Sequence, residues 1–264
     1  MLRNLGVTLQ GTGWLAEAEV VFRRWRAARP TDAAAALAVG CAIRAQGRHE
    51  EARDAFIVAT RLAPELAEAW WDLSLAHLTL GDFAAGWDAY RWRWALPANA
   101  GARRPHNQRA WDGQPIATGR KLLLWGEQGV GDSLMFAACI ADVLIRVPHP
   151  VVEVEARLVP LLARSFPATV VVPSTTPPHP ATQDAGIAAQ APLGELAALF
   201  RRGESSFLRH HGWLIPNRDR VTQLRNRYGA PPGRGGSASP GAAPTRSAAA
   251  AGRWSPPTSH RSQG

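Results

Sequence analysis

Three glycines and an aspartate lie close together in the stretch KLLLWGEQGVGDSLMF, which runs from Lys121 to Phe136. The apolar run before them predicts a strand, and the residues from Ser133 onward predict a helix. Glycine allows turns and close approaches that other residues resist, so a strand, a glycine turn and a helix N-terminus favour a ligand pocket. Many such units need the turn for packing alone. We predict that a ligand-binding loop is formed by Gly126, Glu127, Gln128, Gly129 and Gly131. The alternative is that the turn serves packing alone.

The turn matches neither common nucleotide-binding motif. Its glycine order, G-x-x-G-x-G, differs from the dinucleotide fingerprint, and no Gly-Lys-Ser or Gly-Lys-Thr ends it as in a phosphate-binding loop. The turn instead delivers a carboxylate, Asp132, to a helix N-terminus at the carboxyl end of a strand, where ligands bind in parallel sheets. By its position Asp132 is also suited to cap that helix by accepting backbone N–H bonds.

The elements around this loop predict a parallel sheet. Runs rich in β-branched residues, VVEVEA and ATVVVP, follow KLLLW along the chain. The intervening segments, SLMFAACIADVLI and RLVPLLARSF, have helical character. Strand, helix, strand, helix, strand is the pattern of a Rossmann-like lobe.

The first third of the chain repeats itself every 34 residues. Phe22 recurs as Phe56 and, in the same register, as Tyr90, and glycines recur at Gly13, Gly47 and Gly81. Each unit predicts two helices, and successive units must stack to cover their apolar faces. The three aromatic residues are predicted to be core.

This period, with its glycine, alanine, aromatic and proline positions, resembles the tetratricopeptide repeat across residues 1–97, about three repeats. The resemblance implies a concave groove, lined by the first helix of each pair, that binds an extended peptide or helix. An alternative is that so short an array uses its groove to hold the next domain. The register places the following residues in the groove: Arg3, Asn4, Val7, Arg44, Trp71 and Asp72.

Four segments together resemble bacterial proteins in which such repeats precede a glycosyltransferase-like domain of the two-lobed B type, similar to heptosyltransferases and O-linked N-acetylglucosamine transferases. They are GDFAAGWDAYRWRW, AWDGQPI, LLLWGEQGVGDSLMF, and APLGELAALFR with HGWLIPNRDR. The fold class is therefore α plus α/β, helical-hairpin repeats followed by a Rossmann-like lobe. We expect a linker at 98–120, the first lobe at 121–228 and a disordered low-complexity tail at 229–264.

The resemblance implies that Asp132 is the general base that takes a proton from an acceptor hydroxyl, with helix capping as the compatible alternative. Where relatives carry glutamine-phenylalanine and then arginine-tyrosine in this helix, the chain has Met135-Phe136 and then Ala138-Cys139, a loss of polar groups that puts catalysis in doubt. The tail has no acidic residue and no Leu, Ile, Val, Phe or Met where the family continues into a second lobe. We therefore expect a truncated or frame-shifted reading, or a natural tail, and no sugar transfer by this chain alone.

Composition narrows the remaining classes. The net charge is +9, but four arginines of the tail contribute to it and the rest of the surface is mixed, so we expect no specific nucleic-acid binding. No apolar run reaches the length of a membrane span and no signal peptide is evident, so we place the protein in the cytoplasm. Cys41 and Cys139 are predicted to be reduced thiols, and no cofactor or metal site is expected.

Two functions stand at this point. The first is a protein-interaction module built on the repeats and fused to an incomplete glycosyltransferase-like lobe, with a protein or peptide as the partner. The alternative is a glycosyltransferase that moves a sugar from a nucleotide-sugar to a protein or glycan acceptor and needs a second lobe.

Overall fold

The structure is a computed structural model that describes residues 1–99, 101, 103–104, 106–207 and 212–229. Residues Met1–Asn217 form one compact unit, and a second begins at Arg218. Except for Gly229, the predicted tail at 229–264 lies outside the described residues.

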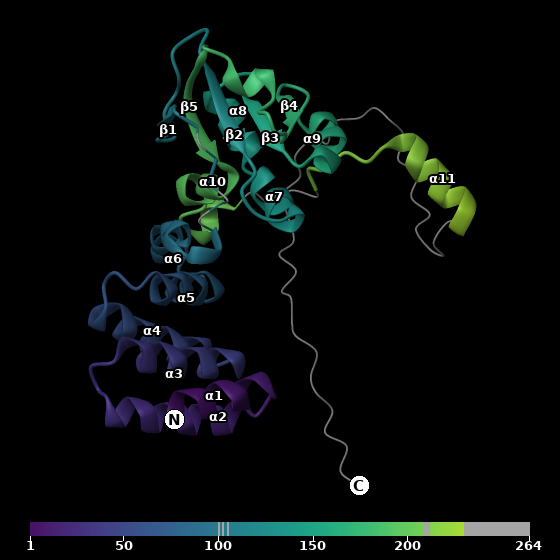
Figure 1. Cartoon of the computed structure of the whole chain (residues 1–264). Coiled ribbons are helices and arrows are strands. Elements are labelled where there is room, and N and C mark those ends of the chain that lie inside the picture. Colours follow the sequence, from purple (N-terminus) through teal and green to yellow (C-terminus); the bar gives the residue numbers. More distant parts are fainter. Residues whose placement is uncertain (100, 102, 105, 208–211, 230–264) are drawn as a thin grey trace. The chain divides into compact units, whose positions relative to one another are not determined.

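Six helices form three consecutive hairpins at the start of the chain (Figure 1). Each hairpin turns through a glycine with positive φ, at Gly13, Gly47 and Gly81, a conformation that side chains with a Cβ rarely adopt. The 34-residue period therefore reflects one turn used three times. The helices are α1 (Leu2–Gly11), α2 (Leu15–Ala28), α3 (Ala33–Ala45), α4 (His49–Leu62), α5 (Ala67–Thr79) and α6 (Phe83–Tyr90).

The predicted core aromatics are buried at equivalent positions. Phe22 is 1% exposed, Phe56 0% and Tyr90 5%, which confirms the prediction that these three aromatic residues are core. Phe22 and Phe56 belong to the core of the hairpins, whereas Tyr90 belongs to the core of the following sheet lobe. The third hairpin thus contributes to two cores.

Five parallel strands form one sheet in the order β1-β5-β2-β3-β4. The strands are β1 (Arg109–Ala110), β2 (Lys121–Trp125), β3 (Val151–Val154), β4 (Val170–Pro173) and β5 (Ile187–Pro192). β2 is apolar throughout its last four residues, all buried, as expected for a strand covered on both faces. The predicted fold class, helical hairpins followed by a parallel-sheet lobe, is confirmed.

Helices and short 3-10 turns connect and flank the strands. The α-helices are α7 (Val130–Ala137), α8 (Ile140–Arg146), α9 (Val159–Ser165) and α10 (Leu193–Phe200), and α11 (Arg218–Tyr228) belongs to the second unit. The 3-10 helices are η1 (Arg91–Ala95), η2 (Pro97–Asn99), η3 (Ala156–Leu158), η4 (Pro180–Gln183) and η5 (Glu204–Ser206). No helix of the described residues has the length and apolar character needed to cross a bilayer.

The structure adds details that the sequence patterns did not predict. The helix predicted in SLMFAACIADVLI is interrupted at Ala138 and Cys139 and forms α7 and α8. The segment 98–120, expected to be a linker, supplies the edge strand β1, which pairs with β5. The adjacent Trp111 is 6% exposed and belongs to the sheet core, so this segment is part of the lobe.

Candidate functional site

The predicted glycine loop lies at the carboxyl end of β2. The backbone N–H of Gly126 donates to the carbonyl of Glu153 on β3, which extends the ladder one residue past the strand (2.8 Å). Gly129 is the N-cap residue of α7, with extended backbone. The loop therefore leaves the sheet and enters the helix within four residues, and the helix begins at Val130, three residues before the predicted start at Ser133.

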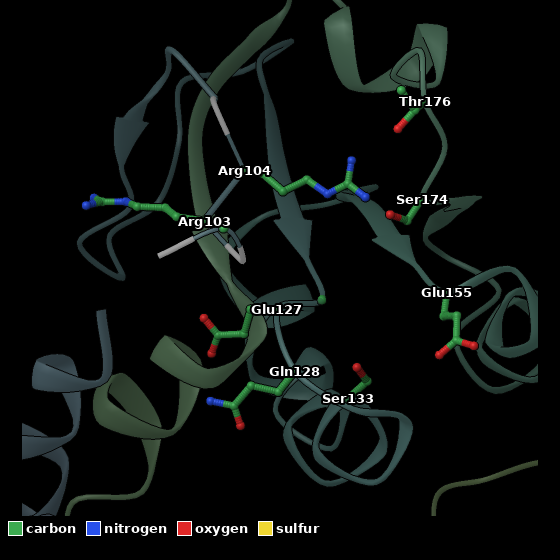
Figure 2. Close-up of a pocket in the computed structure, with 10 residues that line it drawn as sticks. Arg103, Arg104, Glu127, Gln128, Ser133, Glu155, Ser174 and Thr176 are labelled. Carbon is green, nitrogen blue, oxygen red and sulfur yellow. The ribbon is translucent and has the colours of Figure 1, made fainter. Parts of the chain in front are cut away.

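A cavity of about 450 Å³ lies at the carboxyl ends of β2, β3 and β4 (Figure 2). Three of the predicted loop residues, Gly126, Glu127 and Gln128, line it. The other described side chains and glycines around it are Gly101, Arg103, Arg104, Ser133, Glu155, Ser174 and Thr176. The lining consists of charged, amide and hydroxyl groups, so the cavity is suited to a polar ligand.

Glu127 is held by an arginine from the end of the repeats. Its side chain is 2% exposed, and Nη2 of Arg93 donates to both of its carboxylate oxygens at 3.0 Å. The same nitrogen donates to Oε1 of Glu195 on α10 at 2.8 Å. Burial raises the pKa of Glu127, and the neighbouring Arg93 opposes that rise. Glu127 is a buried partner of an ion cluster, and its carboxylate is engaged.

Gln128 is tied to the repeats as well. Its amide nitrogen lies 3.0 Å from the Tyr90 hydroxyl, and its amide oxygen lies 3.2 Å from that hydroxyl. Burial raises the pKa of Tyr90 to about 12, so the phenol stays protonated at neutral pH. Tyr90 and Arg93 together fix the loop from the repeat side, a link that no sequence motif indicated.

Asp132 lies in the first turn of α7 and is half-buried. It is not among the residues that line the cavity. Gly129 holds the N-cap position, and among the described residues the helix has no side-chain cap hydrogen bond. A carboxylate in the first turn still interacts favourably with the helix dipole. Gly129 and Gly131 are exposed and also lie outside the cavity lining. The base assignment of Asp132 stays a prediction.

Several cavity residues carry no signal in the sequence. Ser133 is 5% exposed and lines the cavity; its backbone N–H donates to the Gly129 carbonyl at 2.9 Å, and its hydroxyl makes no hydrogen bond to the other described residues. Arg104, which lines the cavity, lies 3.2 Å from the buried carboxylate of Glu153, and His106 lies 3.6 Å from it, in contacts without hydrogen-bond geometry. Arg104 and His106 come from the segment expected to be a linker, which is why sequence reasoning missed them.

The predicted groove residues fall into two sets. Arg3, Asn4 and Val7 on α1 are exposed, Val7 by 57%. Arg3 and Asn4 line a hollow of about 650 Å³ that also includes Trp25 and Asp32. Arg3, Asn4 and Val7 are therefore open to solvent in the first hairpin.

The other three groove residues make contacts within the chain. Nη1 of Arg44 donates to Oδ1 of Asp72 at 2.9 Å, and the Cys41 thiol donates to Oδ2 at 3.2 Å. Trp71 packs against Tyr90, with ring centroids 5.2 Å apart. Because Tyr90 belongs to the core of the sheet lobe, Trp71 packs against that lobe. This contact fits the alternative in which a short array uses its groove to hold the next domain.

The described residues contain no group of three or more His, Cys, Asp or Glu side chains arranged to hold a metal ion. Cys41 and Cys139 are free thiols. Burial raises the pKa of Cys41 to about 12 and that of Cys139 to about 11, so both stay protonated near neutral pH.

Comparison with known proteins gives one sequence match and several similar solved structures. No protein-family model matches. FlbA of Caulobacter vibrioides is 34% identical over 102 residues, 38% of this chain and 17% of FlbA, so the match spans a small part of that protein.

Solved structures with similarity include the chaperone SycD of Yersinia enterocolitica in complex with a peptide of the translocator YopD. It shares 18% identity and a TM-score of 0.35, over 38% of this chain and 76% of SycD. The tetratricopeptide domain of Sgt2 from Aspergillus fumigatus shares 22% identity and a TM-score of 0.34, over 44% of this chain and 89% of the Sgt2 domain. A mutant O-GlcNAc transferase of Thermobaculum terrenum shares 19% identity and a TM-score of 0.35, over 69% of this chain and 35% of the transferase.

Two of these structures are a tetratricopeptide domain and an O-GlcNAc transferase. We take the class of the protein from its own helices and strands. It is a protein of three helical hairpins joined to a Rossmann-like parallel-sheet lobe.

Proposed function

We propose that this chain is a protein-interaction module whose first hairpin binds a peptide segment of a partner. The observation that carries the proposal is the hollow of about 650 Å³ lined by Arg3 and Asn4, two residues that the repeat register assigns to the groove. Val7, one helical turn from Arg3 and Asn4, adds an exposed apolar side chain on the same helix. Apolar anchors beside charged groups suit recognition of a short segment.

The test is selection of peptides against the whole chain from a random library, followed by calorimetry. We expect Arg3→Glu and Val7→Asp to weaken binding of the selected peptides about tenfold or more, equivalent to about 1.4 kcal/mol. Arg24→Glu is the matched control, because Arg24 is an exposed arginine on α2, the second helix of the same hairpin. Equal losses for Arg3→Glu and Arg24→Glu, or no selected peptide, would contradict the proposal.

The second candidate is a glycosyltransferase-like activity of the sheet lobe, which the polar cavity at the carboxyl ends of β2, β3 and β4 supports. A nucleotide-sugar and an acceptor would be its ligands. Both carboxylates that line the cavity are already paired. Glu127 binds Arg93, and Glu155 lies 2.7 Å from Arg157. Asp132, the predicted base, does not line the cavity.

We therefore expect no nucleotide release when the chain is incubated with UDP-, GDP- and ADP-sugars and candidate acceptors. A base accelerates transfer only when donor and acceptor are held together in reach of it, an arrangement that supplies about 7–11 kcal/mol of a barrier. Turnover that disappears in Asp132→Asn would establish the enzyme instead. The Asp219→Asn variant is the control, since Asp219 lies on α11 in the second unit.

A further inference from the structure

A second pocket, of about 220 Å³, lies at the carboxyl ends of β5 and β2 and is closed by α10. The next strand along the chain after β2 is β3, which pairs with one edge of β2, whereas β5 pairs with the other edge. The strand order therefore reverses between β2 and β5. Crevices at such a reversal are the usual ligand sites of open parallel sheets. Three tryptophans line this pocket, Trp94, Trp111 and Trp125, together with Gln190 and Glu195.

The aromatic walls are held in place by their own polar edges. The Trp125 indole N–H donates to Oε1 of Gln190 at 2.6 Å, and the Trp94 indole N–H donates to Oε1 of Glu195 at 3.3 Å. The two rings pack with centroids 5.8 Å apart. Because the edges are anchored, the rings are preorganised, and the cost of ordering them on binding is small.

A guanidinium already occupies the position that this pocket favours. The exposed Arg103 lines the pocket, and its guanidinium carbon lies over the Trp94 ring, 5.9 Å from the centroid. Tryptophan is the aromatic residue that attracts cations most strongly. The chain's own side chain thus shows which chemistry the ring accepts.

The fixed charges near the pocket also favour one cation at the position that Arg103 takes. The buried Arg93 faces two carboxylates, Glu127 and Glu195, which leaves one negative charge in excess. The Glu195 side chain is 33% exposed, and its Oε2 atom has no hydrogen-bond partner among the described residues. The guanidinium of Arg103 lies at the pocket and balances this excess charge. A cation from outside the chain can take its place.

We propose that this pocket binds the guanidinium group of an arginine side chain presented by a peptide. The incoming group replaces Arg103 over Trp94 and uses Glu195 as its counter-charge. A guanidinium combines a planar face that stacks on an indole with donors that match a carboxylate, whereas an ammonium lacks the planar face. The site is separate from the hollow of the first hairpin and does not depend on it.

The experiment measures binding of capped Gly-Arg-Gly to the whole chain by calorimetry, at low ionic strength to limit screening. The capped citrulline tripeptide is the neutral isostere, and the capped lysine tripeptide tests the ammonium. We expect the arginine peptide to bind at least about tenfold more tightly than either, since it alone combines charge with a stacking plane. Two-dimensional NMR of the indole N–H groups should show shifts at Trp94 and Trp125.

Two variants keep the test independent of folding defects. Arg103→Ala removes the internal competitor from an exposed position, so we expect the arginine peptide to bind about threefold or more tightly than to the unchanged chain. Arg120→Ala, at another exposed arginine, is the control and should leave binding unchanged. Ala198→Leu fills the pocket without altering its charges and should abolish binding.

Several results would overturn the proposal. They are citrulline or lysine peptides that bind as tightly as the arginine peptide, an Arg103→Ala variant that binds no better than the unchanged chain, and binding that survives Ala198→Leu. Free arginine that binds more tightly than the capped peptide would overturn the assignment to a peptide side chain and point to a small-molecule ligand.

Discussion

Replacing Arg93 by methionine is expected to lower the free energy of unfolding by about 3–5 kcal/mol, because it leaves a buried carboxylate without its cation. The Arg93 side chain is 1% exposed and that of Glu127 2%. The guanidinium also lies over the rings of Tyr90 and Trp94, 4.5 and 4.4 Å from their centroids. Urea denaturation of the two proteins measures the difference.

Two further variants separate the buried cluster from arginine loss in general. Arg202→Met breaks an exposed pair with Asp88, whose side chains are 47% and 62% exposed, and should cost no more than about 1 kcal/mol. The double variant Arg93→Met with Glu127→Met removes both buried charges and should recover at least half of the loss. An Arg93→Met variant that loses no more than Arg202→Met would contradict the role given to the cluster.

The pH dependence of the Arg93→Met variant gives an independent check. Burial already raises the pKa of Glu127, and losing Arg93 removes the contact that opposes the rise. A carboxyl whose pKa is higher in the folded than in the unfolded state favours folding when protonated, and this advantage is lost as pH rises through the folded pKa. The deficit of the variant should therefore be smallest near pH 4 to 5, close to the ordinary range for Glu, and grow toward neutral pH.

The repeat region was predictable because its signals are local and recur. A glycine in the turn, a small residue on the first helix and an aromatic residue on the second are each needed once per hairpin. The same contact therefore appears twice in full, between Gly6 and Phe22 and between Gly40 and Phe56. Strands β2, β3 and β4 were predictable for a similar reason, since each is a continuous run rich in branched or large apolar residues.

The rest of the lobe lacked such signals. The strand β5 reads IAAQAP, whose small residues carry little strand preference, and it is specified by pairing with β2 over a long separation. β1 is two residues long. The cluster of Arg93, Glu127 and Glu195 joins residues 34 and 102 positions apart, so no local pattern shows it. Long-range contacts of this kind decide the candidate site, which is why the loop was found and its partners were not.

Phe56→Ala is expected to cost about 3–5 kcal/mol of unfolding free energy, as for other large core aromatics. Phe56 is 0% exposed and fills the space next to Gly40 so closely that a Cβ built on that glycine would lie 2.4 Å from the Phe56 ring. Gly40→Ala alone should therefore also destabilise, by about 1–3 kcal/mol, through overpacking. A loss below about 1 kcal/mol for Phe56→Ala would mean that the repeat register is wrong.

The double variant Gly40→Ala with Phe56→Ala tests whether the two residues act through one contact. Once the ring is gone, the added methyl has room, and alanine is a better helix former than glycine by about 1 kcal/mol. The double variant should then be less destabilised than the two single losses added together, and no worse than Phe56→Ala alone. Gly11→Ala is the control, because Gly11 is also a helical glycine, the last residue of α1, yet a methyl added there has no neighbouring atom within 4 Å. This change should not destabilise the protein. Additive losses in the cycle would show that Gly40 and Phe56 are independent and that the close helix packing does not fix the 34-residue register.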